Sequence, residues 1–268
     1  MIENLRSKRG RKAQITIFVI LAIIVVALIA FLFVPQIRRA IIPAAPEEMI
    51  PKACVEQAVR ESLNTTMIHG GRVNPELYFM YNNETVDYLC YTNTWYQMCT
   101  MQNPFLLQSV ESETTKDSQP EIEKCINEMV TRLQNRGYNV KISGAKRAEI
   151  NLIPGKIVVS FNMTMTIEKG EEKQSFSGSR FQTEFKSNAY EIIMVASSIQ
   201  NWEARLGEAI PETYMGYYPN LKVEKKKQDD GTKIYIITDR DTLEVLQFAT
   251  RSLSWPPGYA FPPSSKTI

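Results

Sequence analysis

Histidine is almost absent from this chain, and the short patterns that mark common metal and catalytic sites are missing. The 268 residues include one histidine and four cysteines, with no Cys-x-x-Cys and no His-x-x-x-His pair. Zinc sites and thiol redox sites most often depend on such spacings. Gly-x-Ser-x-Gly, a Gly-rich phosphate loop and His-Glu-x-x-His are also missing. The sequence therefore predicts no metal site, no cofactor and no catalytic residue, and it favours a protein that is not an enzyme.

A strong excess of one charge is missing too. The chain holds 31 Lys and Arg residues against 29 Asp and Glu residues. Residues 1–12 contain five of the basic residues and one acidic residue, so the rest of the chain is slightly acidic. A surface that binds nucleic acid needs a basic field. We therefore expect no nucleic-acid partner.

One long apolar run lies near the N-terminus. Residues 15–34 read ITIFVILAIIVVALIAFLFV, and Thr16 is the one polar residue among them. A helix of this length rises about 30 Å, the thickness of the hydrocarbon core of a bilayer. Because the five basic residues precede the run, the positive-inside rule places residues 1–14 in the cytoplasm. We expect a single-pass transmembrane helix in the cell membrane, with the lipid bilayer as a partner and the remaining chain extracytoplasmic.

The junction between the basic leader and this run resembles the class III signal of type IV pilins and archaellins, especially the archaeal form. In that signal a Lys/Arg-rich leader ends in a small residue and the apolar helix begins with Gln, and here these residues are Ala13 and Gln14. The resemblance implies cleavage between them by a prepilin-peptidase-like enzyme, and other pilin-like subunits as partners. Phe18 takes the fifth place after that cut, where typical bacterial pilins have a glutamate that registers subunits in the filament. The alternative is an uncleaved signal anchor.

Beyond the apolar run, the sequence predicts a spacer, one folded domain and a tail. Residues 35–51 favour a stiff, extended spacer because they contain several prolines. Residues 52–254 predict an extracytoplasmic domain, and residues 255–268 predict a flexible C-terminal tail. The spacer prolines are Pro35, Pro43, Pro46 and Pro51, and those of the tail are Pro256, Pro257, Pro262 and Pro263.

Within the domain, apolar residues recur with a helical period in three stretches. The first begins after Pro51 and ends near Gly70. The second is expected to start at Pro120, with Ser118 as its cap, and to stop at Gly137. The third covers residues 187–206. Its residues expected to face inward are Ile192, Val195, Ala196, Ile199, Trp202 and Leu206.

Other stretches alternate with a period of two, which is typical of strands. The clearest is residues 157–167, where every second residue is apolar. Further strands are expected at residues 138–152, 176–185, 221–224, 233–238 and 243–251. Helices followed by strands, without regular alternation, predict an α+β fold in which helices pack on an antiparallel sheet.

The domain is similar to an uncharacterised group of membrane-anchored archaeal exterior proteins. These share an apolar anchor, a Cys-led first helix that ends in Gly-Gly, a second helix with a Cys, and a sheet. The matching segments here are Cys54-Val55-Glu56, Gly70-Gly71, Cys125 and residues 138–167. The group carries no known activity, so the resemblance adds none.

Cys54, Cys90, Cys99 and Cys125 all follow the apolar run, and an even number of exterior cysteines favours two disulfides. Three pairings are possible. Cys90 and Cys99 flank a short hairpin-like stretch, whereas Cys54 and Cys125 lie on apolar stripes of two helices that should pack together. We therefore prefer Cys90–Cys99 and Cys54–Cys125. Four buried free thiols are the alternative.

A few other residues are candidates for surface chemistry. Asn64, Asn83 and Asn162 each begin an Asn-x-Ser/Thr sequence and are candidate N-glycosylation sites, as in a glycoprotein. The lone His69 is expected to be a cation at a helix end. Aromatic residues gather in residues 78–96 and again in residues 214–218. Each group favours packing, with a sugar- or protein-binding face as the alternative.

These features predict a single-pass, pilin-like cell-surface protein with a non-enzymatic role in adhesion or surface-filament assembly. The alternative is a membrane-anchored extracytoplasmic binding module that does not polymerise. The two differ at the N-terminus, because a filament subunit must be cut before Gln14, whereas an anchored module keeps residues 1–13.

Overall fold

The structure is a computed structural model that describes residues 20–26, 51–170, 172–177 and 181–254. The chain divides into two compact units, Met1–Met49 and Ile50–Ile268. In the first unit, residues 20–26 form a helix with exposed side chains. The basic leader, the Ala13–Gln14 junction, the rest of the apolar run, the spacer up to residue 50 and the tail lie outside the described residues.

Two helices, α3 (Lys52–Ile68) and α4 (Leu106–Asn135), pack against each other in the second unit. The stripe predicted for α3 is confirmed, since Val55, Val59 and Leu63 are buried. The helix α4 begins well before the predicted start, and Pro120 lies inside it. Ser118 does not cap the helix, because its Oγ donates to the Thr114 carbonyl oxygen at 2.7 Å. Thr114 and Ser118 are buried although they are polar, so this part of α4 lacks the helical period of apolar residues.

A four-stranded antiparallel sheet lies against α4. Its strands are β4 (Asn139–Ile153), β5 (Lys156–Lys169), β6 (Glu172–Ser177) and β7 (Gln182–Lys186). The strand β4 pairs with one edge of β5, while β6 and β7 share its other edge. The alternation predicted for β5 is confirmed, because one face is buried along the whole strand. The buried residues are Ile157, Val159, Phe161, Met163, Met165 and Ile167.

Side chains of α4 also cover the free edge of β4. The Glu111 carboxylate accepts a hydrogen bond from the Leu152 N–H at 2.8 Å, and the Gln119 side-chain oxygen accepts one from the Ala148 N–H at 3.1 Å. Unpaired strand edges otherwise template pairing with other chains. The helix therefore protects this edge as well as packing on the sheet.

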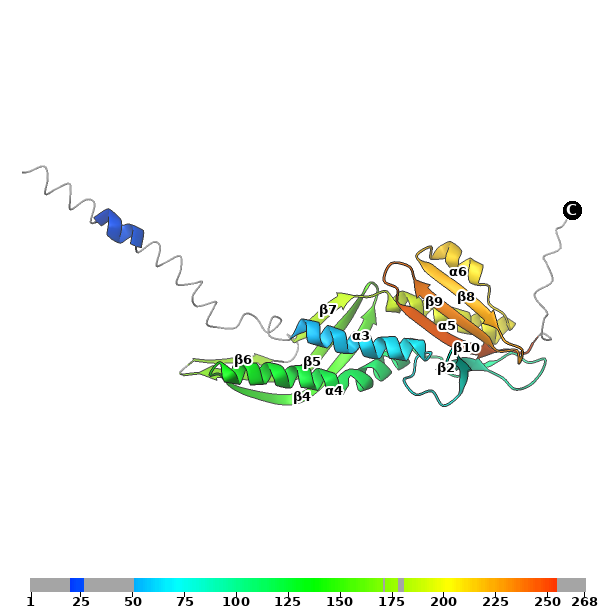
Figure 1. The fold of residues 1–268 in the computed structure, drawn as a ribbon, viewed down its shortest axis with the longest axis horizontal. Helices are drawn as coiled ribbons and strands as arrows, with labels where there is room; N and C mark the ends of the chain where they lie inside the picture. The colour runs from blue at the N-terminus through cyan, green and yellow to red at the C-terminus, as the bar shows by residue number, and fades with distance from the viewer. Residues whose placement is uncertain (1–19, 27–50, 171, 178–180, 255–268) are drawn as a thin grey trace, which may run out of the picture. The chain divides into compact units, whose positions relative to one another are not determined.

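A second, six-stranded sheet lies at the other end of the domain (Figure 1). Its strands are β1 (Tyr78–Tyr81), β2 (Glu84–Tyr91), β3 (Thr100–Met101), β8 (Leu221–Lys227), β9 (Lys233–Asp239) and β10 (Val245–Arg251). The order is β1-β2-β10-β9-β8, with β3 also paired to β2. The strands β2 and β10 are parallel, and all other neighbours are antiparallel.

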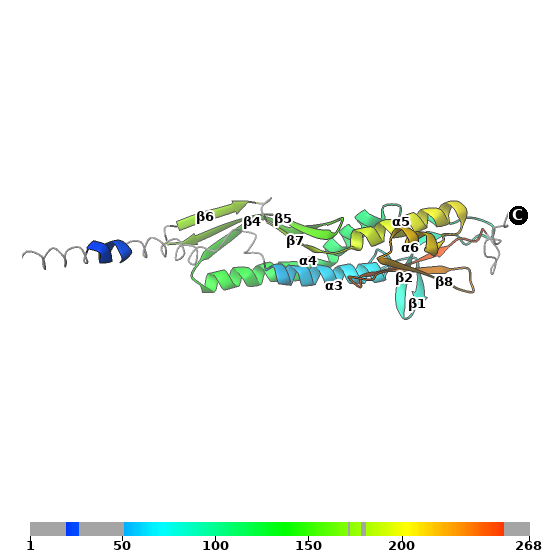
Figure 2. The same ribbon diagram turned by 90° about the horizontal axis from the view of Figure 1, so that it is seen from above.

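Two more helices accompany this sheet. The helix α5 (Ala189–Leu206) packs against β2, β9 and β10, and the short α6 (Pro211–Tyr217) packs against β8. Figure 2 shows α6 beside α5, and Ser198 on α5 contacts Tyr214 on α6. Pro211 suits the first turn of α6, because the missing N–H of proline has no intrahelical partner there.

The predicted fold class is wrong as stated. Helices and strands are mixed as in an α+β protein, but they form two sheets rather than one, and the β2–β10 pair is parallel. Among the described residues, no helix is long and apolar enough to cross a membrane.

Candidate functional site

An open, mostly apolar groove of about 740 Å³ lies between α5 and α6. One wall is the outer face of α5, where Met194, Ser198, Trp202 and Leu206 recur every fourth residue along one line. The facing wall comes from α6 and the residues on either side of it. The other lining residues are Val195, Glu208, Ile210, Thr213, Tyr214, Tyr217 and Tyr218.

Large side chains in this groove are exposed to solvent. Trp202 is 50% exposed and Tyr217 is 79% exposed, and Met194, Leu206 and Ile210 are exposed as well. An isolated exposed apolar residue is ordinary, but a contiguous group of them in a concave surface marks a binding site. The volume is also within the range of pockets that hold ligands or peptide side chains.

The sequence placed Trp202 and Leu206 in the core, and this prediction was wrong. The buried face of α5 is instead completed by Gln200 and Glu203, two polar residues. The Gln200 side chain donates to the Leu89 and Asn103 carbonyl oxygens at 2.8 and 3.0 Å. These partners lie far away in the chain, so periodicity could not reveal them. The available signal was that α5 has more apolar residues than one face can bury.

The aromatic group of residues 214–218 is divided between packing and exposure. Tyr214 is buried and its hydroxyl pairs with the Ser198 Oγ at 3.1 Å, which joins α6 to α5. Burial raises the pKa of Tyr214, so its hydroxyl stays protonated at neutral pH. Tyr217 and Tyr218 are exposed and line the groove.

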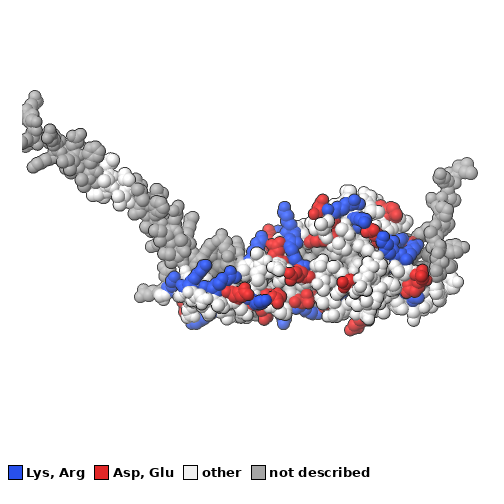
Figure 3. All heavy atoms as spheres, in the orientation of Figure 1, with Lys and Arg blue, Asp and Glu red and all other residues white. Residues whose placement is uncertain are grey.

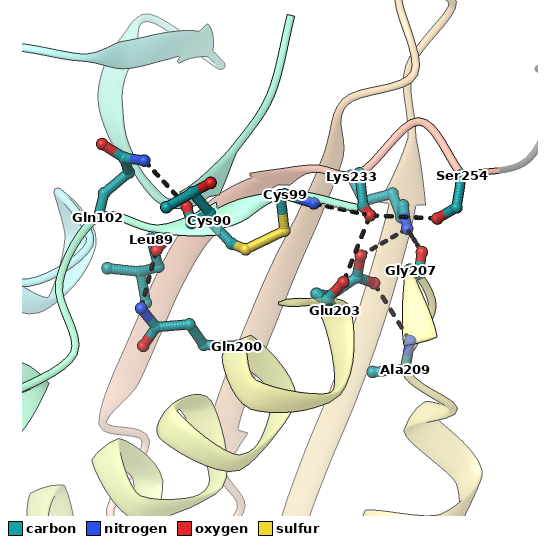
Figure 4. The surroundings of a disulfide bond; sticks show 12 residues. Leu89, Cys90, Cys99, Gln102, Gln200, Glu203, Gly207, Ala209, Lys233 and Ser254 are labelled. Carbon is teal, nitrogen blue, oxygen red and sulfur yellow. Dashed lines mark hydrogen bonds and ion pairs between the residues drawn. A yellow bond between two sulfur atoms is a disulfide. The ribbon is translucent and has the colours of Figure 1, made fainter. Parts of the chain in front are cut away.

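A buried ion-pair cluster lies beneath the connection between α5 and α6 (Figure 4). Lys233 on β9 places its Nζ 2.6 Å from Glu203 Oε2 and 3.2 Å from Glu208 Oε2. Tyr235 donates its hydroxyl hydrogen to the other oxygen of Glu203. Lys225 on β8 forms an ion pair with Glu208.

The same cluster holds the backbone of that connection. Lys233 donates to the Gly207 carbonyl oxygen at 2.6 Å, and Lys225 donates to the Ala209 carbonyl oxygen at 2.8 Å. The Ala209 N–H donates to Glu203 Oε1 at 3.2 Å. Two lysines of the sheet and one carboxylate of α5 therefore fix the turn that sets the distance between the groove walls.

Burial and charge act in opposite directions on these carboxyl groups. Burial raises the pKa of Glu203, although Lys233 acts to lower it. Burial also acts to raise the pKa of Glu208, but Lys233 and Lys225 outweigh it and leave that pKa lowered. The pKa of Tyr235 lies well above 10 because of its burial and the nearby Glu203. The two carboxyl groups that share Lys233 therefore have pKa values shifted in opposite directions.

Both disulfides that the sequence analysis preferred are present. Cys54–Cys125 joins α3 to α4, and Cys90–Cys99 joins the end of β2 to the residue before β3. Figure 4 shows the second disulfide beside the buried cluster. Ser252 connects this disulfide to the buried cluster. Its Oγ accepts a hydrogen bond from the Cys99 N–H at 3.2 Å and donates one to the Glu203 carbonyl oxygen at 3.3 Å.

The other residues singled out in the sequence are dispersed. Asn64, Asn83 and Asn162 are all exposed, on α3, in the β1–β2 turn and on β5. His69 ends α3, where its ring nitrogens contact the Val73 carbonyl oxygen at 2.8 Å and Glu84 Oε2 at 3.0 Å. The aromatic group of residues 78–96 is also divided between packing and exposure, with Tyr88 buried and Tyr96 exposed.

Charged residues of both signs are interspersed over the face of the domain shown in Figure 3, without an extended field of one sign. In the part of the chain that the structure describes, no group of three or more His, Cys, Asp and Glu side chains is placed to hold a metal ion. The α5–α6 groove is therefore the best-supported functional surface of the described residues.

Comparisons with known proteins add nothing to this assignment, because no family model, no curated protein and no solved structure matches the chain.

Proposed function

We propose that the protein is a non-enzymatic, pilin-like cell-surface protein that takes part in adhesion or surface-filament assembly, and that it contacts a protein partner through the α5–α6 groove. The observation that carries this proposal is the line of exposed apolar side chains on α5 that lines one groove with the exposed Tyr217 and Tyr218 at the end of α6. Aromatic residues and Met are enriched where proteins bind one another.

The two disulfides support a place outside the cytoplasm. Disulfides persist in oxidising compartments and are rare among cytosolic proteins. Here both stabilise the domain rather than the groove itself, since neither pair lines it. Together with the leader that resembles a class III signal, they favour a domain exposed at the cell surface.

The polar groups of the groove favour binding rather than chemistry. The Ser198 hydroxyl is engaged with Tyr214, and Glu208 is engaged with Lys225, Lys227 and Lys233. Each of these groups has a structural partner and holds a wall in position. What the groove presents to a partner is mainly apolar and aromatic surface, which suits a protein segment with apolar side chains.

Paired variants test the groove in cells that produce the protein in place of the native copy. Trp202→Ala and Tyr217→Ala each remove a large exposed side chain of the groove. Trp95→Ala and Tyr96→Ala are matched controls, because those residues are 48% and 76% exposed and lie outside the groove. We expect the groove variants to lose about tenfold or more in cell adhesion or in recovery from sheared fibres, since exposed aromatic anchors dominate protein interfaces.

Equal losses in the groove and control variants would contradict the groove as the contact surface. Unchanged adhesion and unchanged fibre recovery in both groove variants would contradict the proposed role of the groove in adhesion or filament assembly. Circular dichroism and thermal melts of the purified variants verify that the folded domain is retained, which exposed substitutions generally allow.

A further inference from the structure

The described part of the chain ends beside Gly207, which follows the last residue of α5. Ser254 is the last described residue, and a Cβ placed on Gly207 would lie 1.8 Å from its Oγ. Figure 4 shows Ser254 beside Gly207 at the end of α5. Leu206 and Glu208, the two neighbours of Gly207, both line the groove. Residue 255 therefore follows a residue that lies against Gly207, between two residues that line the groove.

The next residues have the composition that an aromatic groove binds. Residues 255–263 read Trp-Pro-Pro-Gly-Tyr-Ala-Phe-Pro-Pro, with three aromatic side chains and four prolines. Proline-rich segments lose little conformational entropy on binding, because proline already restricts the backbone. Recognition of such segments by aromatic-lined grooves is a recurring mode of protein binding.

The length of this segment also matches the groove. The wall on α5 extends from Leu206 back to Met194, and these positions are about 18 Å apart at 1.5 Å per residue. The steps from Trp255 to Phe261 cover about 19 Å at ~3.1 Å per residue in a polyproline conformation. The segment can therefore follow the α5 wall from the end where it starts.

We propose that residues 255–263 bind in the α5–α6 groove of the same molecule and compete with the partner for it. This inference rests on the proposed function, because it assigns an occupant to the same groove. A segment tethered at the rim is present at a millimolar effective concentration, so even weak intrinsic affinity fills the groove for much of the time. Partner binding then requires the segment to leave.

Hydroxyl-radical footprinting of the full chain in detergent tests this occupancy, with oxidation of each tryptophan followed by peptide mass spectrometry. The comparison is between the natural chain and a Trp255→Ala/Phe261→Ala double variant. Thermal melts of the two proteins verify that the folded domain is retained in the double variant. Trp95 serves as an internal reference, because its exposure of 48% is close to the 50% of Trp202.

We expect Trp202 to be oxidised about threefold faster in the double variant, as when a tethered segment fills the groove for about two thirds of the time. The rate at Trp95 should stay the same. Equal Trp202 rates in the two proteins would overturn the proposal. Protection that disappears on dilution would overturn it as well, since binding to a second copy depends on concentration whereas binding within one molecule does not.

The two proposals fail separately. If Trp202 is equally reactive in both proteins while Trp202→Ala still abolishes adhesion, the segment does not occupy the groove and the proposed function stands. If the segment protects Trp202 while adhesion and fibre recovery are unaffected by Trp202→Ala, the segment is the occupant and the proposed role of the groove in adhesion or filament assembly is wrong.

Discussion

Asp87 is a carboxyl group in an unfavourable environment. It lies on β2 with 1% of its surface exposed, and within the described residues neither of its oxygens has a hydrogen-bond partner. Burial raises the pKa of Asp87 from its ordinary value of 3.8 to about 7, although Arg72, with Nε 3.6 Å from Oδ2, acts to lower it. The side chain is therefore protonated over much of the acidic range.

Replacing Asp87 by Asn should change how stability depends on pH. A carboxyl group whose pKa is raised on folding stabilises the fold below its unfolded pKa, and this contribution is lost as pH rises through the folded pKa. Relative to Asp87→Asn, the natural protein should lose up to about 4 kcal/mol of unfolding free energy between pH 4 and pH 8. Urea unfolding at several pH values measures this difference.

The matched control is Glu121→Gln, which changes an exposed carboxylate on α4. Its unfolding free energy should follow that of the natural protein across the same pH range, because an exposed ion pair contributes little. A constant difference between the natural protein and Asp87→Asn from pH 4 to pH 8 would disprove the raised pKa.

Lys233 provides a second residue-scale prediction, because it is the cation buried with Glu203. Lys233→Met leaves the carboxyl group without its cation and removes the hydrogen bond to Gly207. We expect it to lower the unfolding free energy by about 3–5 kcal/mol, as when one partner of a buried ion pair is removed. Adding Glu203→Gln should restore part of the loss, since a neutral amide costs less to bury.

Equilibrium unfolding in urea at pH 7 measures both Lys233 variants. Lys222→Met is the control, because Lys222 forms an exposed ion pair with Glu224 on the same sheet. That change should cost no more than about 1 kcal/mol. A loss of similar size in Lys222→Met and Lys233→Met would contradict the role of the buried cluster.

At the scale of elements, the two disulfides close loops of very different length. Cys54 and Cys125 are 71 residues apart and join two helices, whereas Cys90 and Cys99 are 9 residues apart. On the loop-entropy account, removing both cysteines of the longer loop costs about 4 kcal/mol, and removing both of the shorter loop costs about 3 kcal/mol. Double Ser variants avoid leaving a free thiol.

Thermal or urea unfolding of the two double Ser variants tests this order. Non-reducing peptide mapping of the natural protein first establishes that the expected peptides are linked. Recovery of all four cysteines as free thiols, from protein isolated without reductant, would contradict both pairs. A larger loss from the shorter loop would show that local packing, rather than loop entropy, decides the contribution.

Elements with one buried face could be predicted from the sequence, and elements fixed by distant polar partners could not. The alternation in residues 157–167 was sufficient for β5, because solvent and core select opposite faces of a strand. The start of α4 was missed because Thr114 and Ser118 are polar residues in core positions. The parallel pairing of β2 with β10 joins segments about 160 residues apart, and no local pattern encodes such a contact.

The groove shows the same limit. The sequence could group Tyr214, Tyr217 and Tyr218. Which of them are buried and which are exposed depends on the orientation of α5 about its helix axis. That orientation is set by Glu203 and Lys233, which are 30 residues apart. A single sequence therefore does not show which residues pair with a buried charge.

At the scale of the whole molecule, the N-terminus separates filament subunit from anchored module. If the class III signal is used, native protein begins at Gln14, and Ala13→Trp blocks cleavage because the peptidase requires a small residue before the cut. Intact mass and N-terminal sequencing of protein from cells measure this directly. A native chain that retains Glu3 and Arg6 would contradict the pilin-like function and favour the anchored binding module.

The position of the Cys54–Cys125 bond also decides how the domain carries a mechanical load. Cys54 lies in the first turn of α3, so tension arriving along the chain from Pro51 meets the covalent cross-link almost at once. The tension then passes directly into α4, and the loop that contains β1, β2 and β3 lies off the covalent load path. A domain held at its N-terminal side and pulled by a partner on α5 is therefore strained through α4 and β4–β7, while the loop closed by the disulfide cannot be drawn out.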